Sequence, residues 1–130
     1  MNTNPARILV VDDQRQNREL LDVMLTRDGF LVLTATSGVE ALAVVAQQQP
    51  DLIVLDVMMP DMTGYEVTAR IRGDLATKHI PVMIVTALDG RNAMELALST
   101  GADDCLTKPV HRAELLERVR NLLRRKTHGD

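Results

Sequence analysis

Short apolar runs alternate along this chain with longer segments in which apolar residues recur every three or four positions. The runs at 7–11, 31–35, 51–55, 81–85 and 104–106 are rich in β-branched residues. Such runs predict strands of a parallel sheet, because strands covered on both faces lack polar alternation. The longer segments predict amphipathic helices. Together they are typical of a repeated strand–helix unit.

Helix boundaries are marked by residues that cap or break helices. Ser37 stands where a second helix would begin, and Glu40 three residues later predicts a capping box. Pro50 ends that segment. A turn cluster at 61–64 precedes a third helical segment, which we expect to run to Gly73.

Alternation of strands and helices predicts an α/β fold, an open parallel sheet with helices on both faces. Right-handed crossovers place helices on either side of the sheet where the strand order reverses, and this opens a crevice at the carboxyl ends of the strands. At 130 residues, and without a Pro/Gly/Ser-rich linker, the chain predicts one domain over 1–125 and a short tail over 126–130.

Composition narrows the classes of function. The net charge of −3 gives no general attraction to nucleic acid or to an anionic membrane surface. No uninterrupted apolar stretch approaches the roughly 20 residues that cross a bilayer. The single cysteine cannot form an internal disulfide, and no secretory signal opens the sequence. We therefore expect a cytoplasmic protein that contacts neither DNA nor membrane directly.

Residues able to handle a phosphoryl group follow four of the predicted strands. Asp12 and Asp13 follow the first strand, and Asp56 follows the third. Thr86 follows the fourth strand and Lys108 the fifth. Because the carboxyl ends of parallel strands meet at one edge of the sheet, we expect a single pocket there.

Three carboxylates in one pocket repel one another, by about 4 kcal/mol for each pair roughly 4 Å apart in a dielectric near 20. A divalent cation relieves this repulsion, and an all-oxygen ligand set is the pattern that Mg²⁺ prefers. Protonation of one carboxyl group, which would raise its pKa, is an alternative that the residues leave open. If phosphorus is attacked, Asp56 is the expected nucleophile, with Thr86 and Lys108 holding the phosphoryl oxygens.

Four segments together resemble the receiver (phosphoacceptor) domain of two-component response regulators: ILVVDDQRQNRELL, DLIVLDVMMPDMTGYEV, IPVMIVTALDGR and GADDCLTKPV. The match runs over essentially the whole chain, and the ordered set is specific although no single piece is. The resemblance implies a flavodoxin-like (βα)5 three-layer sandwich with a five-stranded parallel sheet in the order 2-1-3-4-5. It also implies phosphorylation of Asp56 by a sensor histidine kinase or phosphotransfer protein.

The same resemblance implies a metal site. Mg²⁺ would be bound by Asp13, Asp56 and the backbone carbonyl of Met58. Asp12 would act on the cation directly or through water.

Phosphoryl contacts are implied as well. Thr86 would swing toward the phosphoryl group, with its neighbour Ala87 also in the phosphoryl-binding switch. Lys108 would pair with the phosphoryl group, and the bond from Lys108 to Pro109 would be cis.

At Cys105 the chain departs from this family, which usually carries tyrosine or phenylalanine there. In the family that ring turns inward as the residue equivalent to Thr86 moves, and so reports phosphorylation to the far face. We expect weaker coupling here, or coupling through the loop after Thr86. Taken alone, a solitary cysteine is more often a small buried hydrophobe than a redox thiol.

Dephosphorylation is predicted to be slow. Met58 and Leu88 flank the place where the family tunes this reaction, and neither side chain can readily orient an attacking water.

Other functions stay open at this point. A phosphohydrolase with an aspartyl nucleophile would need a second acidic residue placed to activate water, and room for a substrate. A pseudo-receiver would act only as an interaction module. In the favoured interpretation the chain is not an enzyme beyond its own phosphorylation and autodephosphorylation. A homodimer or an output domain could use the face made by the last strand and the last two helices. Asp12 and Asp13 alone could also cap the first helix.

Overall fold

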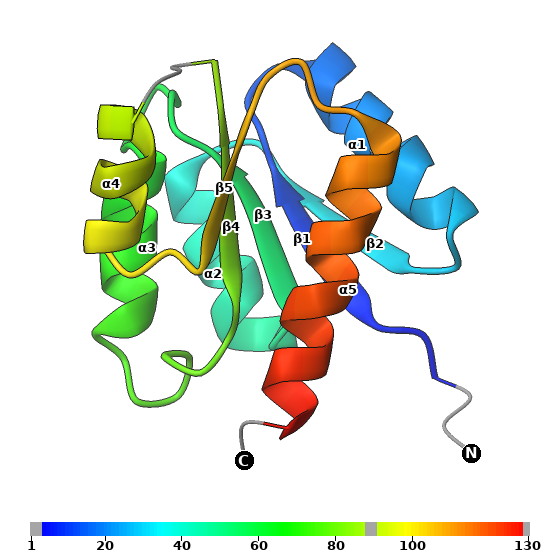
Figure 1. Cartoon of the computed structure of the whole chain (residues 1–130). Coiled ribbons are helices and arrows are strands. Elements are labelled where there is room, and N and C mark those ends of the chain that lie inside the picture. The colour runs from blue at the N-terminus through cyan, green and yellow to red at the C-terminus, as the bar shows by residue number, and fades with distance from the viewer. Residues whose placement is uncertain (1–3, 88–90, 129–130) are drawn as a thin grey trace.

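The computed structural model describes residues 4–87 and 91–128, and Figure 1 shows one parallel sheet between two layers of helices. The strand order is β2-β1-β3-β4-β5. The strands are β1 (Arg7–Val11), β2 (Leu31–Ala35), β3 (Leu52–Asp56), β4 (Val82–Thr86) and β5 (Asp104–Thr107). The helices are α1 (Arg15–Arg27), α2 (Gly38–Gln48), α3 (Gly64–Arg72), α4 (Arg91–Ser99) and α5 (Arg112–His128).

The predicted fold class and strand order are confirmed. Two predicted strands have the observed bounds, β3 and β4 each begin and end one residue later than predicted, and β5 ends one residue later. All four neighbouring strand pairs are parallel, as the buried apolar runs indicated. None of the helices in the described part of the chain combines the length and the apolar character that a bilayer-crossing segment requires.

Each face of the sheet carries its own core. On the α1/α5 face, strand side chains such as Val54 and Leu106 pack against α1 and α5. On the α2–α4 face, alternate side chains such as Ile84 and Cys105 lie in the core cluster with Val67 of α3 and Ala97 of α4. The alternation of strand side chains therefore decides which helices each residue meets.

The predicted capping box at α2 is only half formed. Ser37 Oγ accepts a hydrogen bond from Glu40 N–H at 3.1 Å, but the Glu40 carboxylate accepts from Thr36 N–H at 2.5 Å instead of from Ser37. The complete capping box lies at α3, where Thr63 and Glu66 satisfy one another's backbone N–H groups. The spacing of Thr63 and Glu66 in the sequence was the signal for it.

The β3–α3 loop is hydrogen-bonded to the start of α2 and turns back closely against Asp56. The Asp61 carboxylate accepts hydrogen bonds from Gly38 N–H and Val39 N–H, each at 2.9 Å, and these contacts hold the pKa of Asp61 below its usual range. A Cβ at Gly64 would lie 2.4 Å from the carbonyl oxygen of Asp56, so only glycine permits this approach. The loop after Asp56 is thereby tied to α2 and α3.

Candidate functional site

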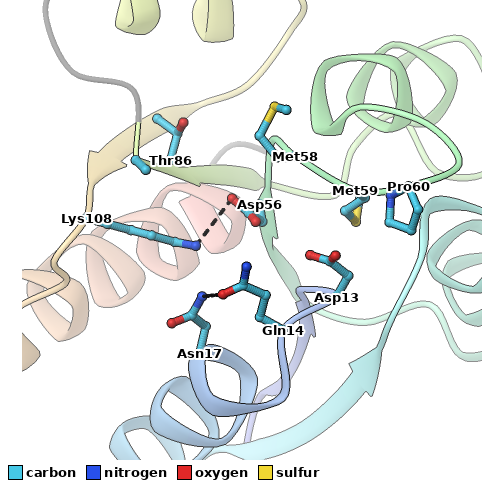
Figure 2. A pocket seen from close by; sticks show the side chains of 10 residues that line it. Asp13, Gln14, Asn17, Asp56, Met58, Met59, Pro60, Thr86 and Lys108 are labelled. Carbon is cyan, nitrogen blue, oxygen red and sulfur yellow. Dashed lines mark hydrogen bonds and ion pairs between the residues drawn. The ribbon is translucent and has the colours of Figure 1, made fainter.

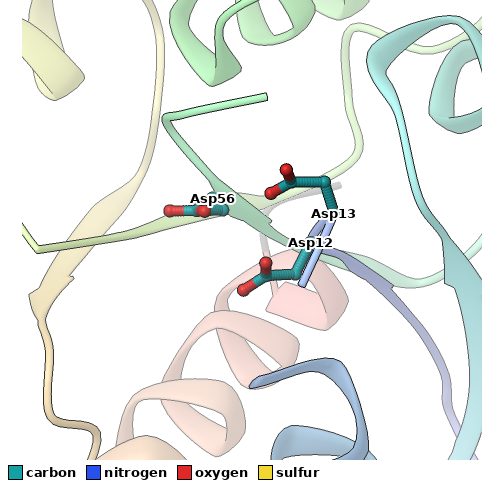
Figure 3. A group of neighbouring side chains, drawn as sticks. All are labelled: Asp12, Asp13 and Asp56. Atoms are coloured by element: carbon teal, nitrogen blue, oxygen red, sulfur yellow. The ribbon is translucent and has the colours of Figure 1, made fainter. Parts of the chain in front are cut away.

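Three carboxylates meet at the carboxyl ends of β1 and β3. Oxygen atoms of Asp12, Asp13 and Asp56 all lie within 4.8 Å of one another (Figure 3). Asp12 and Asp56 are buried and Asp13 is exposed. The structure therefore brings together the acidic residues that the sequence placed at two separate strand ends.

Lys108 supplies the positive charge beside this cluster. Its Nζ lies 3.4 Å from Asp12 Oδ2. The same atom lies 3.5 Å from Asp56 Oδ1 (Figure 2). The Lys108 backbone N–H donates to the carbonyl of Thr86 at 2.8 Å, which holds β5 against the end of β4. The peptide bond from Lys108 to Pro109 is cis, as the resemblance implied.

The surroundings of Asp56 have opposing effects on the pKa of its carboxyl group. Burial raises the pKa of Asp56 above its usual range, the Lys108 ammonium opposes that rise, and the charge of Asp12 adds to it. Val57 N–H donates to Asp56 Oδ1 at 2.9 Å and favours the ionised form. The carboxylate is thus incompletely neutralised, and an additional cation would stabilise it.

Asp12 is not the side-chain cap of α1. The N-cap residue is Gln14, whose side chain makes no capping hydrogen bond. Asp12 Oδ1 instead accepts from Gln14 N–H at 2.9 Å, while the Asp12 carbonyl accepts from Arg18 at 3.0 Å. These bonds fix one Asp12 oxygen and leave Oδ2 toward Lys108.

A cavity of about 510 Å³ opens over Asp56. Thr86 and Ala87 line it at the end of β4, and Lys108 lines it from the position just after β5. The Met58 residue, which is 65% exposed, borders it from the β3–α3 loop. Leu88, the other residue expected to tune dephosphorylation, lies outside the described residues.

Pro109 lines a second hollow, of about 380 Å³, that adjoins the first. Leu20, Leu21, Val85 and Val110 give this hollow an apolar lining. Asn17 and Lys108 line both spaces, so the apolar hollow and the acidic site share a border.

Two carboxamides in the cavity were missed by sequence reasoning. Gln14 and Asn17 project from the start of α1 toward Asp56 and Lys108 (Figure 2). Met59 and Pro60 also line the space. Gln14 and its neighbour Gln16 are both exposed, and nothing in the spacing of polar residues separates them, because the direction of the first helical turn decides which one meets the cavity.

Cys105 is a buried residue with 4% of its surface exposed. Burial raises the pKa of its thiol, the Asp104 charge adds to the rise, and Arg118 opposes it. The thiolate, which is the reactive form, is therefore disfavoured. The burial of Cys105 agrees with its interpretation as a small hydrophobic residue. The position where the resembled family usually carries an aromatic ring therefore holds a buried thiol here.

The residues present fit a hard divalent cation. The three carboxylates offer only oxygen atoms, and two of them are buried with one lysine as the nearest counter-charge. Such a set matches Mg²⁺ and gives no soft ligand for a thiolate-preferring metal.

A family model for the response regulator receiver domain matches residues 8–120. The chain is 50% identical to the response regulator PleD of Caulobacter vibrioides over 92% of its own length and 26% of that protein. It is 47% identical to the response regulator MprA of Mycobacterium tuberculosis over 92% of its length and 51% of that protein. The chain thus spans about a quarter to a half of these relatives.

Among solved structures, a CheY-like receiver domain protein from Methanospirillum hungatei superposes with a TM-score of 0.90. The two share 26% sequence identity, and the match covers 98% of this chain and all of that one. Family model, relatives and fold agree: the chain belongs to the response regulator receiver domains of two-component systems.

Proposed function

We propose that this receiver domain accepts a phosphoryl group on Asp56 in an Mg²⁺-dependent reaction. The observation that carries the proposal is the position of Lys108 Nζ, 3.5 Å from Asp56 Oδ1, beside a cluster of three carboxylates. A phosphoryl group on Asp56 would enter a cavity that already contains an ammonium group and the Thr86 residue.

The chain's own residues perform most of the work of this reaction. The Asp56 carboxylate is the nucleophile, and Lys108 provides counter-charge to an equatorial phosphoryl oxygen. Thr86, buried at the end of β4, provides a hydroxyl at the same cavity. Asp12, Asp13, Asp56 and the Met58 carbonyl would hold Mg²⁺, which when bound neutralises phosphoryl oxygens and the crowded carboxylates.

The phosphodonor that we propose is a phosphohistidine on a sensor kinase or phosphotransfer protein. The apolar hollow beside Lys108 and Pro109 offers such a partner a surface next to the reacting group. Phosphorylation would then shift the population of two surface conformations and change which partner binds. The cytoplasmic location, the output domain and a homodimer through the α4, β5 and α5 face stay predictions.

A phosphohydrolase would turn over many equivalents of substrate, whereas a switch is labelled once. Incubation with excess acetyl phosphate and Mg²⁺ should give up to one phosphoryl group per chain by intact mass, with slow loss afterwards. The Asp56→Asn protein should take none. Rapid multiple turnover would favour the hydrolase, and a wild type that is never labelled would favour the pseudo-receiver.

A further inference from the structure

A pair of carboxamides forms one rim of the cavity. Asn17 Nδ2 donates to Gln14 Oε1 at 3.0 Å. Since this bond engages the amide oxygen of Gln14, the two N–H donors of its amide are left for other partners. Figure 2 shows the Gln14 amide nitrogen directed into the cavity, toward the side where Asp56 lies.

The opposite rim has a different chemistry. Met58 borders the cavity from the β3–α3 loop, on the far side of Asp56 from Gln14 (Figure 2). A thioether is only a weak hydrogen-bond acceptor and donates nothing. Among the described residues that line the cavity, Gln14 and Asn17 are the ones that carry carboxamides. The strongest neutral donors at the cavity's edge therefore lie on the α1 side.

The direction of phosphoryl transfer makes this rim relevant. The attacking and leaving atoms lie roughly in line through phosphorus, so the leaving group departs on the side away from Asp56. That side is the space of the cavity, which Gln14 and Met58 line from opposite sides of Asp56 (Figure 2). A donor at Gln14 is thus placed beside the leaving group, while Lys108 and Thr86 lie deeper.

We propose that Gln14 is a further catalytic residue, which donates to the departing oxygen of an acyl phosphate, and that Asn17 positions it. This inference rests on the proposed phosphorylation of Asp56. Among small-molecule phosphodonors, it assigns to this chain a preference for those whose leaving group is a carboxylate.

The step balances without a further reactant. An Asp56 oxygen forms a bond to phosphorus as the bond from phosphorus to the acyl oxygen breaks, and the electron pair leaves with the carboxylate. No proton is required, because a carboxylate is stable as an anion at neutral pH. The hydrogen bond from Gln14 strengthens as charge develops on the departing oxygen.

Phosphoramidate is the matched comparison. Its leaving nitrogen is protonated and departs as ammonia, so it carries hydrogens and offers no oxygen to Gln14. A donor at the rim should therefore speed transfer from acetyl phosphate more than transfer from phosphoramidate.

The test compares labelling rates from the two donors, in Mg²⁺, for Gln14→Met and for the control Gln16→Met. Gln16 is exposed on the same helical turn and does not line the cavity. Gln14→Met should lower the acetyl phosphate rate about 10-fold relative to the phosphoramidate rate, the effect of one lost donor of modest strength. Asn17→Ala should move the same ratio by about 3-fold, and Gln16→Met should leave it unchanged.

Each result has one meaning. An unchanged donor ratio in Gln14→Met, or equal slowing with both donors, would overturn the inference while leaving the proposed function in place. If Gln14→Met instead left the ratio of labelling rates from the two donors unchanged and altered the rate at which the phosphorylated protein is hydrolysed, Gln14 would act on the attacking water. That result would also overturn the inference. Failure of both donors to label the wild type would overturn the proposed function and the inference together.

Discussion

The two helices that flank β5, α5 on one face of the sheet and α4 on the other, are packed to different degrees. On the α1/α5 face, α5 buries four large apolar side chains: Leu115, Leu116, Val119 and Leu122. On the α2–α4 face, α4 buries only Ala97 among its described side chains. Met94, Leu96 and Leu98 of α4 stay between 41% and 48% exposed.

Strand β5 shows the same contrast in two consecutive residues. Leu106 packs on the α1/α5 face and Cys105 on the α2–α4 face. Cys105, the smaller side chain, lies on the face of α4, the helix whose buried side chain among those described is Ala97. The packing therefore makes α4 the less firmly held of the two helices that flank β5.

The site residues divide between these faces. By strand alternation, Asp56 follows Val54 of the α1/α5 core, whereas Thr86 follows Ile84 of the α2–α4 core. Asp56 thus lies on the face that α5 covers, and Thr86 lies on the face that includes the lightly packed helix α4. The carboxylate and the hydroxyl of the site are therefore supported from opposite faces of the sheet.

The largest effect should come from truncating the α5 core. Leu115 is fully buried, so Leu115→Ala should lower the free energy of unfolding by about 2–5 kcal/mol through lost burial and a cavity. Leu96→Ala on α4, where the residue is 48% exposed, should cost less than about 0.5 kcal/mol. Urea unfolding measures both, and equal losses would remove the contrast between the faces.

Amide hydrogen exchange tests the same contrast without mutation. Because α4 has fewer buried contacts, its amides should open with a free energy at least about 2 kcal/mol lower than those of α5, which is roughly 30-fold faster exchange. Equal protection of the two helices would show that the exposed apolar residues of α4 do not weaken it.

Removing charge from the crowded site should stabilise the metal-free protein. Burial raises the folded-state pKa of Asp56, so the contribution of this group to stability is fully present below the unfolded pKa near 3.9 and is lost as pH rises through the folded pKa. Asparagine does not ionise. Asp56→Asn should therefore be more stable than wild type at pH 7, by about 1 kcal/mol, and this advantage should shrink toward pH 3.

Unfolding in urea at both pH values, without metal, gives these free energies. Added Mg²⁺ should reduce the difference in free energy of unfolding between Asp56→Asn and wild type at pH 7, because the cation should bind folded wild type more tightly than folded Asp56→Asn. An advantage of Asp56→Asn that is the same at pH 3 and pH 7 would contradict the role assigned to ionisation.

The smallest effect is expected at Tyr65, which packs against the α2–α4 core. Its hydroxyl oxygen is buried and has no hydrogen-bond partner among the described residues. Tyr65→Phe should therefore leave the free energy of unfolding unchanged or raise it by up to about 1 kcal/mol. A lower free energy of unfolding in Tyr65→Phe than in wild type would mean that the hydroxyl has a hydrogen-bond partner in solution.

Much of this arrangement could be predicted from the sequence because strands buried on both faces leave an unambiguous apolar pattern. Their polar end residues, Asp12, Asp56, Thr86 and Lys108, then converge by the geometry of a parallel sheet. The confirmed strand order needed more than the pattern, and came from the resemblance.

What could not be predicted depends on helix direction and packing. Gln14 and Gln16 are alike in sequence, and only the entry angle of α1 brings Gln14 to the cavity. The Glu40 carboxylate accepts from Thr36 N–H and not from Ser37 N–H, and the periodicity of the sequence does not distinguish these two donors. The light anchoring of α4 likewise follows from contacts between elements distant in the chain.

Covalent attachment at Asp56 is the claim on which the rest depends, and it can be read directly. The protein is phosphorylated with acetyl phosphate and Mg²⁺, treated with borohydride to reduce the acyl phosphate, digested and sequenced by mass spectrometry. The account predicts conversion to homoserine at position 56 alone. Conversion at position 12 or 13, or a labelled protein with an intact aspartate at position 56, would contradict it.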